Sequence, residues 1–266
     1  MPEITPKWPG LDVGFLILET DTFIVFLDTD LDVDWQTTSK YDEAGPKDPS
    51  RHHEILNQAA TLECVPNDHH SRSVRLNFKR MVGEGVARSL DHDYDCAEKI
   101  LEQARSYIAD RNVETARLWQ LSTGCVLGVA IGIAGLVLWT LRTRSAQAWG
   151  DTVYFLLLSA VAGSLGAVLS MIFRMGRNFP NSEAPKSLHI LEATSRVFAG
   201  CLSGLLVAGS VKMGLILSMF GDAQHLHLTM LVSAMASGAS ERWAPSLIGK
   251  IGASWSQRET NESGSQ

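Results

Sequence analysis

Residues 118–141, LWQLSTGCVLGVAIGIAGLVLWTL, contain no charged side chain. An α-helix rises about 1.5 Å per residue and a bilayer core is about 30 Å thick, so roughly 20 apolar residues cross it. Trp119 and Trp139 bracket the segment at the spacing expected for the two membrane interfaces. The segment therefore predicts a membrane-spanning helix.

Charge divides the 266-residue chain into two parts around Arg117. Residues 1–117 hold 22 of the 29 acidic and 13 of the 23 basic residues, a net charge of −9, whereas residues 118–266 carry +3. The ordinary apolar content and the four cysteines exclude a disordered chain and a small disulfide scaffold. The sequence thus predicts a hydrophilic N-terminal domain followed by a polytopic membrane domain.

Three further segments are apolar enough to enter a membrane. The second span covers residues 153–173, the third covers 197–220 and is interrupted by Lys212, and the fourth covers 227–240. The fourth is short, and a re-entrant or interfacial helix is the alternative. We expect an α+β N-terminal domain and an all-α transmembrane bundle of four helices at 118–250, with a disordered tail at 251–266.

Basic residues predict the orientation of the spans. Arg174, Arg177 and Lys186 lie between the second and third spans, and further basic residues precede the first span and follow the fourth. The positive-inside rule then places both termini in the cytoplasm. The start of the chain lacks the basic-then-apolar run of a signal peptide. The N-terminal domain is therefore expected to be cytosolic, with Cys64 and Cys96 as reduced thiols.

The N-terminal domain combines strand and helix patterns. FLIL (15–18) and TFIVFLD (22–28) read as two strands joined by a polar turn, and the charged region 37–54 reads as a loop. From Ser71 the pattern is helical, with a break at DHDYD (91–95). We assign residues 1–92 to a sensor domain and 93–117 to a connector helix that continues into the first span. One face of that helix is apolar: Ala97, Ile100, Leu101, Ala104 and Ile108.

Four aspartates alternate with other residues after the second strand: Asp28, Asp30, Asp32 and Asp34. On a strand all four carboxylates would share one face about 6.5 Å apart. A solvated face, a cation-attracting or gating surface, and a metal site for nucleotide transfer are the alternatives. The last lacks the glycine-serine lead-in expected of such an enzyme.

Four basic residues fall within nine positions of a predicted helix: Arg72, Arg75, Lys79 and Arg80. Positions 72, 75 and 79 follow the spacing of one helical face. The stripe predicts either contact with a phosphate backbone or a solvated face paired with nearby acids. The histidine pairs at 52–53 and 69–70 have no diagnostic metal spacing.

The predicted spans contain small residues at four-residue spacing and few charges. Glycines at 124, 128 and 132, the 159–163–167 stripe and the 200–204–208 stripe predict close helix packing, with pore lining as the alternative. Lys212 lies within a span and predicts either snorkelling to the interface or a water-filled path. Glu192 and Arg196, four residues apart, predict a local ion pair. No nucleophile–base set, phosphate loop or H-E-x-x-H motif favours an enzyme, and we expect no cofactor.

Several motifs in residues 105–250 resemble a bacterial membrane module. They are GSLGAVLSMIFRMGR (163–177), LEATSRVFAGCLSGLLVAG (191–209) and SAMASGASERWAPSLI (233–248), preceded by the connector SYIADRNVETARLWQL (106–121). Such modules occur in membrane effectors of bacterial antiphage defence, and the similarity is greatest to the effector family of the Hailong system. The residues that match by motif are Gly166, Ser170, Arg174, Arg196, Gly200, Gly204, Ser240, Glu241, Arg242 and Pro245.

The resemblance implies a homotetrameric ion channel in the bacterial inner membrane. It also implies a cytosolic domain that binds a single-stranded oligo-deoxyadenylate signal made by a partner nucleotidyltransferase. Bound DNA would hold the channel closed, and its destruction by phage nucleases would open the channel and kill the cell. From our own reading of the residues, Lys212 and the four aspartates join Arg174, Arg196, Glu241 and Arg242 as gating candidates. A membrane-anchored sensor without conduction and a small-solute transporter are the alternatives.

Overall fold

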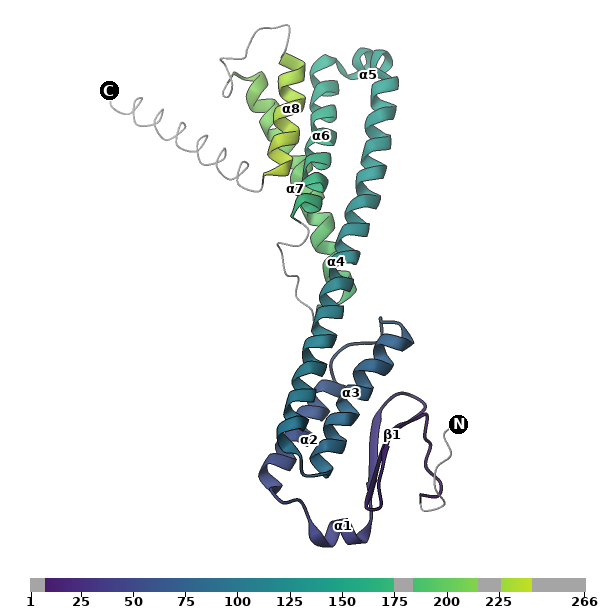
Figure 1. Ribbon diagram of the computed structural model, residues 1–266. Helices are drawn as coiled ribbons and strands as arrows, with labels where there is room; N and C mark the ends of the chain where they lie inside the picture. The colour runs from purple at the N-terminus through teal and green to yellow at the C-terminus, as the bar shows by residue number, and fades with distance from the viewer. Residues whose placement is uncertain (1–7, 175–183, 215–225, 241–266) are drawn as a thin grey trace, which may run out of the picture. The chain divides into compact units, whose positions relative to one another are not determined.

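A computed structural model describes residues 8–174, 184–214 and 226–240 (Figure 1). Contacts divide the chain into an N-terminal unit, up to Glu114, and a helical unit, from Thr115 onward. The N-terminal unit is an α+β fold with one three-stranded sheet, and the helical unit contains only helices within its described residues. Three helices are long and apolar enough to cross a membrane.

The sheet is an antiparallel meander in the order β1–β2–β3. Strands β1 (Phe15–Glu19) and β2 (Phe23–Leu27) confirm the two predicted strands, and β2 is buried along its whole length. Strand β3 (Val33–Thr37) was not predicted, because three of its five residues are exposed and give little apolar signal. The third strand pairs Leu27 with Val33 and Phe23 with Thr37.

The prediction of a loop at residues 37–54 is wrong. Helix α1 (Ser39–Ala44) and helix α2 (Pro49–Glu63) occupy most of it. Asp48 caps α2 through its side chain, which accepts hydrogen bonds from the backbone N–H groups of Ser50 and Arg51, and Pro49 fits the first turn. Among the charged and turn-forming residues that indicated a loop, Asp48 and Pro49 instead mark the start of this helix.

Helices α3 (Arg72–Leu90) and α4 (Tyr94–Thr140) confirm the predicted helices and the break between them. The connector and the first predicted span form one continuous helix of 47 residues. Four of the five residues predicted on its apolar face are buried: Ala97, Leu101, Ala104 and Ile108.

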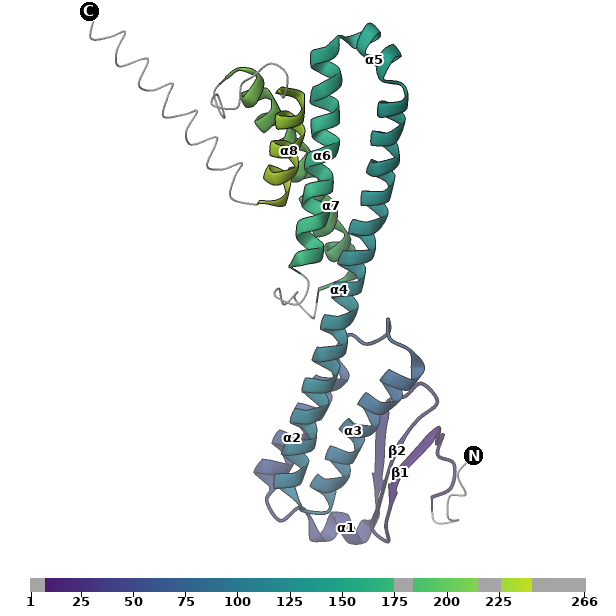
Figure 2. The same ribbon diagram turned by 45° about the horizontal axis from the view of Figure 1, so that its top comes forward.

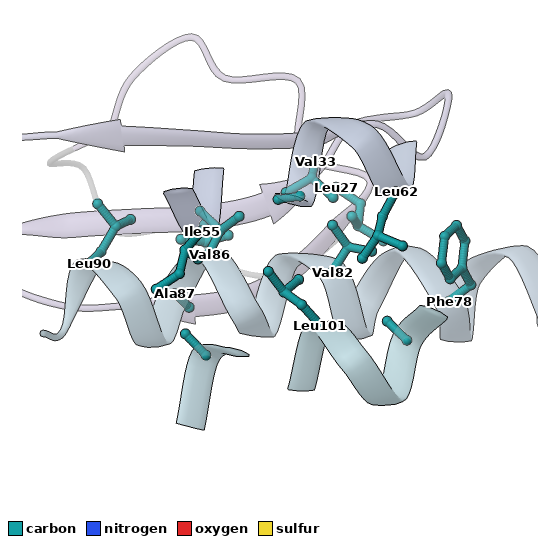
Figure 3. Close-up of a cluster of buried hydrophobic side chains, with 14 of the residues drawn as sticks. Leu27, Val33, Ile55, Leu62, Phe78, Val82, Val86, Ala87, Leu90 and Leu101 are labelled. Carbon is teal, nitrogen blue, oxygen red and sulfur yellow. The ribbon is translucent and has the colours of Figure 1, made fainter. Parts of the chain in front are cut away.

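The core of the N-terminal unit lies between one face of the sheet and the helices. Helix α3 packs against all three strands and places Phe78, Val82 and Val86 in the core. Figure 2 shows it beside the sheet. Leu27 and Val33 of the sheet, Ile55 and Leu62 of α2 and Leu101 of α4 complete it (Figure 3). Trp8 packs with Ile24 and Phe26 in a second cluster, so both faces of β2 are covered.

Within its described residues, the helical unit contains the second half of α4 and four more helices. They are α5 (Arg142–Trp149), α6 (Asp151–Phe173), α7 (Lys186–Lys212) and α8 (Leu226–Ala239). Helices α6, α7 and α8 pack against one another (Figures 1 and 2). Helix α5 was not predicted, since it is short and polar. Helix α8 has 14 residues, fewer than the other three apolar helices.

The third predicted span differs from α7 at both ends. The helix begins at Lys186 rather than near Val197, and it ends at Lys212, where Gly214 follows with φ +69°. Residues 215–220 of the prediction lie outside the described residues. Lys212 is therefore the last residue of a helix, where a positive charge faces the partial negative charge of the helix C-terminus.

Candidate functional site

Glycines bring α6, α7 and α8 into backbone contact. A Cβ placed on Gly163 of α6 would overlap the carbonyl oxygen of Gly200 on α7, and one on Gly238 of α8 would overlap the carbonyl oxygen of Gly163. A Cβ on Gly204 would lie 2.6 Å from the carbonyl oxygen of Ser159. Such close approach is the known use of small residues between apolar helices. The 159–163–167 and 200–204–208 stripes therefore serve packing within one chain.

A pocket of about 450 Å³ lies beside these contacts. Its lining contains no carboxylate and is rich in hydroxyl groups: Ala167, Ser170, Met171, Arg196, Ala199, Gly200, Ser203, Ser237, Gly238 and Ser240. Because three helices contribute to it, the pocket is a property of the assembled bundle. A pocket with four serines and an arginine in its lining, in an otherwise apolar bundle, is a candidate site for an ion, water or a polar ligand.

Ser203 is the unusual residue of this pocket. Most serines of the bundle donate to a carbonyl of their own helix, as Ser159 does to Phe155 at 2.8 Å and Ser210 does to Leu206 at 2.8 Å. Ser203 is 5% exposed, and its hydroxyl has no hydrogen-bond partner in the described parts of the chain. A buried polar atom of this kind usually hydrogen-bonds to water or a ligand. Ser203 is thus a buried hydroxyl of the pocket lining that has no acceptor among the described residues.

Arg196 brings a positive charge to the pocket and is anchored outside it. Its Nη2 donates to Glu192 Oε1 at 2.9 Å, which shows the expected ion pair. The other oxygen, Glu192 Oε2, accepts a hydrogen bond from Gln120 Nε2 of α4 at 2.7 Å. His189 lies beside them with 2% exposure, and its Nδ1 is 3.4 Å from Gln120 Nε2. A polar network therefore joins α4 to the pocket wall.

The basic stripe of α3 does not form one solvent-exposed face. Lys79 is buried, and its Nζ donates to Asp32 at 3.1 Å and to Glu63 at 3.0 Å. This triad joins α3 to α2 and to the segment before β3. Lys79 is therefore a buried structural cation and not part of an exposed basic face.

The other three basic residues differ in how they are paired. Arg80 pairs with Glu84 at 2.9 Å, and Arg75 bonds the Asn67 side chain at 3.2 Å. Arg72 is exposed and has no ion pair within the described residues. It lines a second pocket, of about 330 Å³, at the start of α3. The other lining residues are Gly14, Phe15, Asp28, Leu31, Ser73 and Leu76.

The four aspartates do not share one strand face. Asp28 Oδ1 accepts hydrogen bonds from the backbone N–H groups of Asp30 at 2.9 Å and Asp32 at 2.8 Å, so these three residues form a turn stabilised by its own side chain. Only Asp34 lies on a strand. Burial, together with the charges of Asp28, Glu63 and Asp32, raises the pKa of the Asp34 carboxyl. The sequence alternation is thus largely a turn signal.

Two of the remaining gating candidates, Lys212 and Arg174, lie at helix ends. Lys212 Nζ contacts the hydroxyl of Thr152 at the start of α6, and the side chain is exposed. Arg174 follows the end of α6. Glu241 and Arg242 lie outside the described residues. The described ranges contain no group of three His, Cys, Asp or Glu residues that could hold a metal ion.

Sequence reasoning missed Ser203, Gln120 and His189. Serine and glutamine are ordinary residues in a span, and only their contacts distinguish these two from their neighbours. His189 offered a signal, since it lies three residues before Glu192 on the same helix.

Comparisons of the chain with protein-family models, with curated proteins and with solved structures found no match. The resemblance to antiphage effectors therefore stays a prediction from the motifs.

Proposed function

We propose that this chain is a ligand-gated ion-channel effector of bacterial antiphage defence in the inner membrane. The bundle of α4, α6, α7 and α8 would form the channel, as a homo-oligomer that the family resemblance suggests to be a tetramer. The N-terminal unit would be the cytosolic sensor, and both termini would face the cytoplasm. Loss of the bound ligand would open the channel and kill the cell.

One observation carries the conducting role. The pocket of α6, α7 and α8 is lined by four serines and by Arg196, in a bundle whose buried residues are mostly apolar or small. A polar group within a membrane is costly, and such groups line ion and water paths more often than lipid-facing surfaces. A scaffold would need only the glycine contacts, whereas the available Ser203 hydroxyl suits a hydrated path.

The sensor's ligand follows from the family resemblance, which suggests a single-stranded oligo-deoxyadenylate made by a partner nucleotidyltransferase. Arg72 supports an anionic ligand, because it is the exposed cation at the rim of the 330 Å³ pocket. Phe15, Leu31 and Leu76 line the same pocket and offer apolar surface to a base. A ligand that binds the closed state more tightly than the open state would hold the channel shut.

Ion flux through liposomes containing the full-length protein tests the proposal. We expect flux in the absence of oligo-deoxyadenylate and its suppression when the oligonucleotide is added on the sensor side. Ser203→Ala should change the unitary conductance, while Ser210→Ala should not, because Ser210 donates to its own helix. An absence of flux in every condition would leave a membrane-anchored sensor as the correct function, and substrate-coupled uptake without conductance would indicate a transporter.

A further inference from the structure

Ser203 is the only buried serine within the described residues of α6, α7 and α8 that does not donate to its own helix. The others donate to a backbone carbonyl three or four residues earlier: Ser159, Ser164, Ser210, Ser233 and Ser237. Such a bond occupies the hydroxyl proton within the helix. The Ser203 proton has no acceptor in the described parts of the chain, so this position points to a bound group that accepts a hydrogen bond.

Two further serines of the same pocket resemble Ser203. Ser170 of α6 and Ser240, directly after α8, are half-buried and line the pocket. Their hydroxyls make no hydrogen bond with any residue that the structure describes. The pocket therefore combines three hydroxyl donors from three separate segments, and the fold of the described chain uses none of them.

Arg196 adds positive charge to the same lining. It forms an ion pair with Glu192 at 2.9 Å, and Arg196 lines the pocket whereas Glu192 does not. The pocket therefore meets the positive end of this pair, whatever else the guanidinium contacts. No described residue of the lining carries a carboxylate. A metal cation would meet a like charge here and no anionic ligand, whereas an anion is attracted.

The ends of α6 and α8 also border the pocket, and a helix C-terminus carries partial negative charge. Backbone N–H groups occupy carbonyls beside the lining hydroxyls: Arg174 donates to the Ser170 oxygen at 3.0 Å, and Ser240 donates to the Ser237 oxygen at 3.1 Å. These bonds reduce the number of free acceptors. A water molecule brings two donors that need acceptors, whereas an anion only accepts. The lining therefore suits an anion better than water alone.

On α7, Arg196, Gly200 and Ser203 follow one helical face, and Ser203 lies about 10 Å farther along the helix than Arg196. The volume of about 450 Å³ holds a small ion with part of its hydration shell. We infer that this pocket binds a small monovalent anion of chloride size, which Arg196 attracts and the serine hydroxyls hydrogen-bond, Ser203 foremost. Binding does not depend on conduction. That the anion also permeates rests on the proposed channel function.

Chloride-35 NMR of the full-length protein in detergent measures the binding, because exchange with a protein site broadens the chloride signal. Ser203→Ala should lower the affinity of the saturable broadening at least about tenfold, the lower limit for one hydrogen bond to a charged group. Ser210→Ala is the matched control and should match the wild type, since Ser210 lies on the same helix at 6% exposure and donates to Leu206.

Ser170→Ala, at a half-buried position on α6, should weaken binding in the same direction, so a packing defect on α7 cannot explain both losses. A wild type without saturable broadening overturns the inference. Affinities of Ser203→Ala and Ser170→Ala equal to that of Ser210→Ala also overturn it.

Reversal potentials connect binding with conduction. In membranes that contain the full-length protein under a KCl gradient, the current should reverse closer to the chloride than to the potassium equilibrium potential. Ser203→Ala should move the reversal toward zero, and Ser210→Ala should not. A reversal near the potassium equilibrium potential overturns permeation of the anion. Absence of current in the wild type overturns the proposed channel, whereas the NMR titration tests the anion site in either case.

Discussion

Gly163 of α6 lies against Gly200 of α7 so closely that a Cβ on Gly163 would overlap the Gly200 carbonyl oxygen. The same residue meets Gly238 of α8 through its own carbonyl oxygen. One position without a side chain thus sets the separation of three helices, and the hydroxyl-lined pocket lies beside it.

Gly163→Ala should destabilise the helical unit by about 1–3 kcal/mol, the usual cost of overpacking, because backbone atoms cannot move aside as side chains can. Thermal unfolding of the full-length protein in detergent measures this. Gly132→Ala is the control, since a Cβ there meets no atom within 4 Å. Equal unfolding temperatures of the two variants would contradict the close backbone packing of α6, α7 and α8 at Gly163.

Lys79→Ala should destabilise the N-terminal unit by about 3 kcal/mol, because it leaves Asp32 and Glu63 without their buried cation. This value is the lower limit of the about 3–5 kcal/mol that breaking a buried ion pair costs, because Asp32 is largely exposed. Amide exchange in α2, α3 and β3 of the full-length protein measures the change. Lys99→Ala, on an exposed position of α4, should leave exchange unaltered. Equal protection in both variants would show that the triad contributes nothing.

Arg72→Glu should weaken binding of a fluorescent oligo-deoxyadenylate at least fivefold, because it reverses the exposed charge at the pocket rim. Arg80→Glu changes charge equally but removes a cation already paired with Glu84, so its effect should be smaller. Fluorescence anisotropy at two salt concentrations measures both. Equal losses of affinity in the two variants would indicate that binding depends on the overall charge of the surface. The pocket would then not be the ligand site.

Stability of the N-terminal unit should fall as the pH drops below about 6.5. Burial, with the charges of His53 and His92, lowers the pKa of His52 from its model-compound value of 6.5, so the folded state favours the neutral ring. That contribution is complete above pH 6.5 and is lost as the pH falls toward the folded-state pKa.

His52→Gln should flatten this dependence, because an amide can keep the contact that the ring makes with Ser89 at 2.9 Å and does not titrate. Amide exchange in α2 and α3 between pH 7.5 and 5.5 provides the measurement, after correction for the intrinsic pH effect. His53→Gln, at an exposed position, should retain the wild-type slope. If the stability of His52→Gln depends on pH as strongly as that of the wild type, groups other than His52 cause the pH dependence.

Hydropathy and periodicity were sufficient to predict β1, β2, α3, α4 and α6, because each contains either a continuous apolar run or an apolar face that repeats along the sequence. They failed for β3, whose exposed residues at 34–36 carry no such repeat. They failed for α2 because the number of charged residues in this region favours a loop. The side chain of Asp48 in fact caps the helix.

The candidate site was predictable only in part. The glycine stripes and the Glu192–Arg196 pair follow from spacing on one helix. Ser203, Gln120 and the pairing of Lys79 depend on which helices meet, and no local pattern encodes that. Lys79 shows the difference most clearly, since its helical spacing with Arg72 and Arg75 predicted a shared solvent face, yet it is buried.

The glycine contacts have a mechanical consequence. At the glycine contacts no side chains separate α6, α7 and α8. These three helices therefore resist displacement relative to one another. Against α6, by contrast, α4 places glycines at 124, 128 and 135 that meet only the side chains of Met171, Val168 and Val161. Side chains can change rotamer, whereas backbone atoms in contact cannot move apart without separating the helices. Relative motion within the helical unit should therefore occur mainly between α4 and the group formed by α6, α7 and α8.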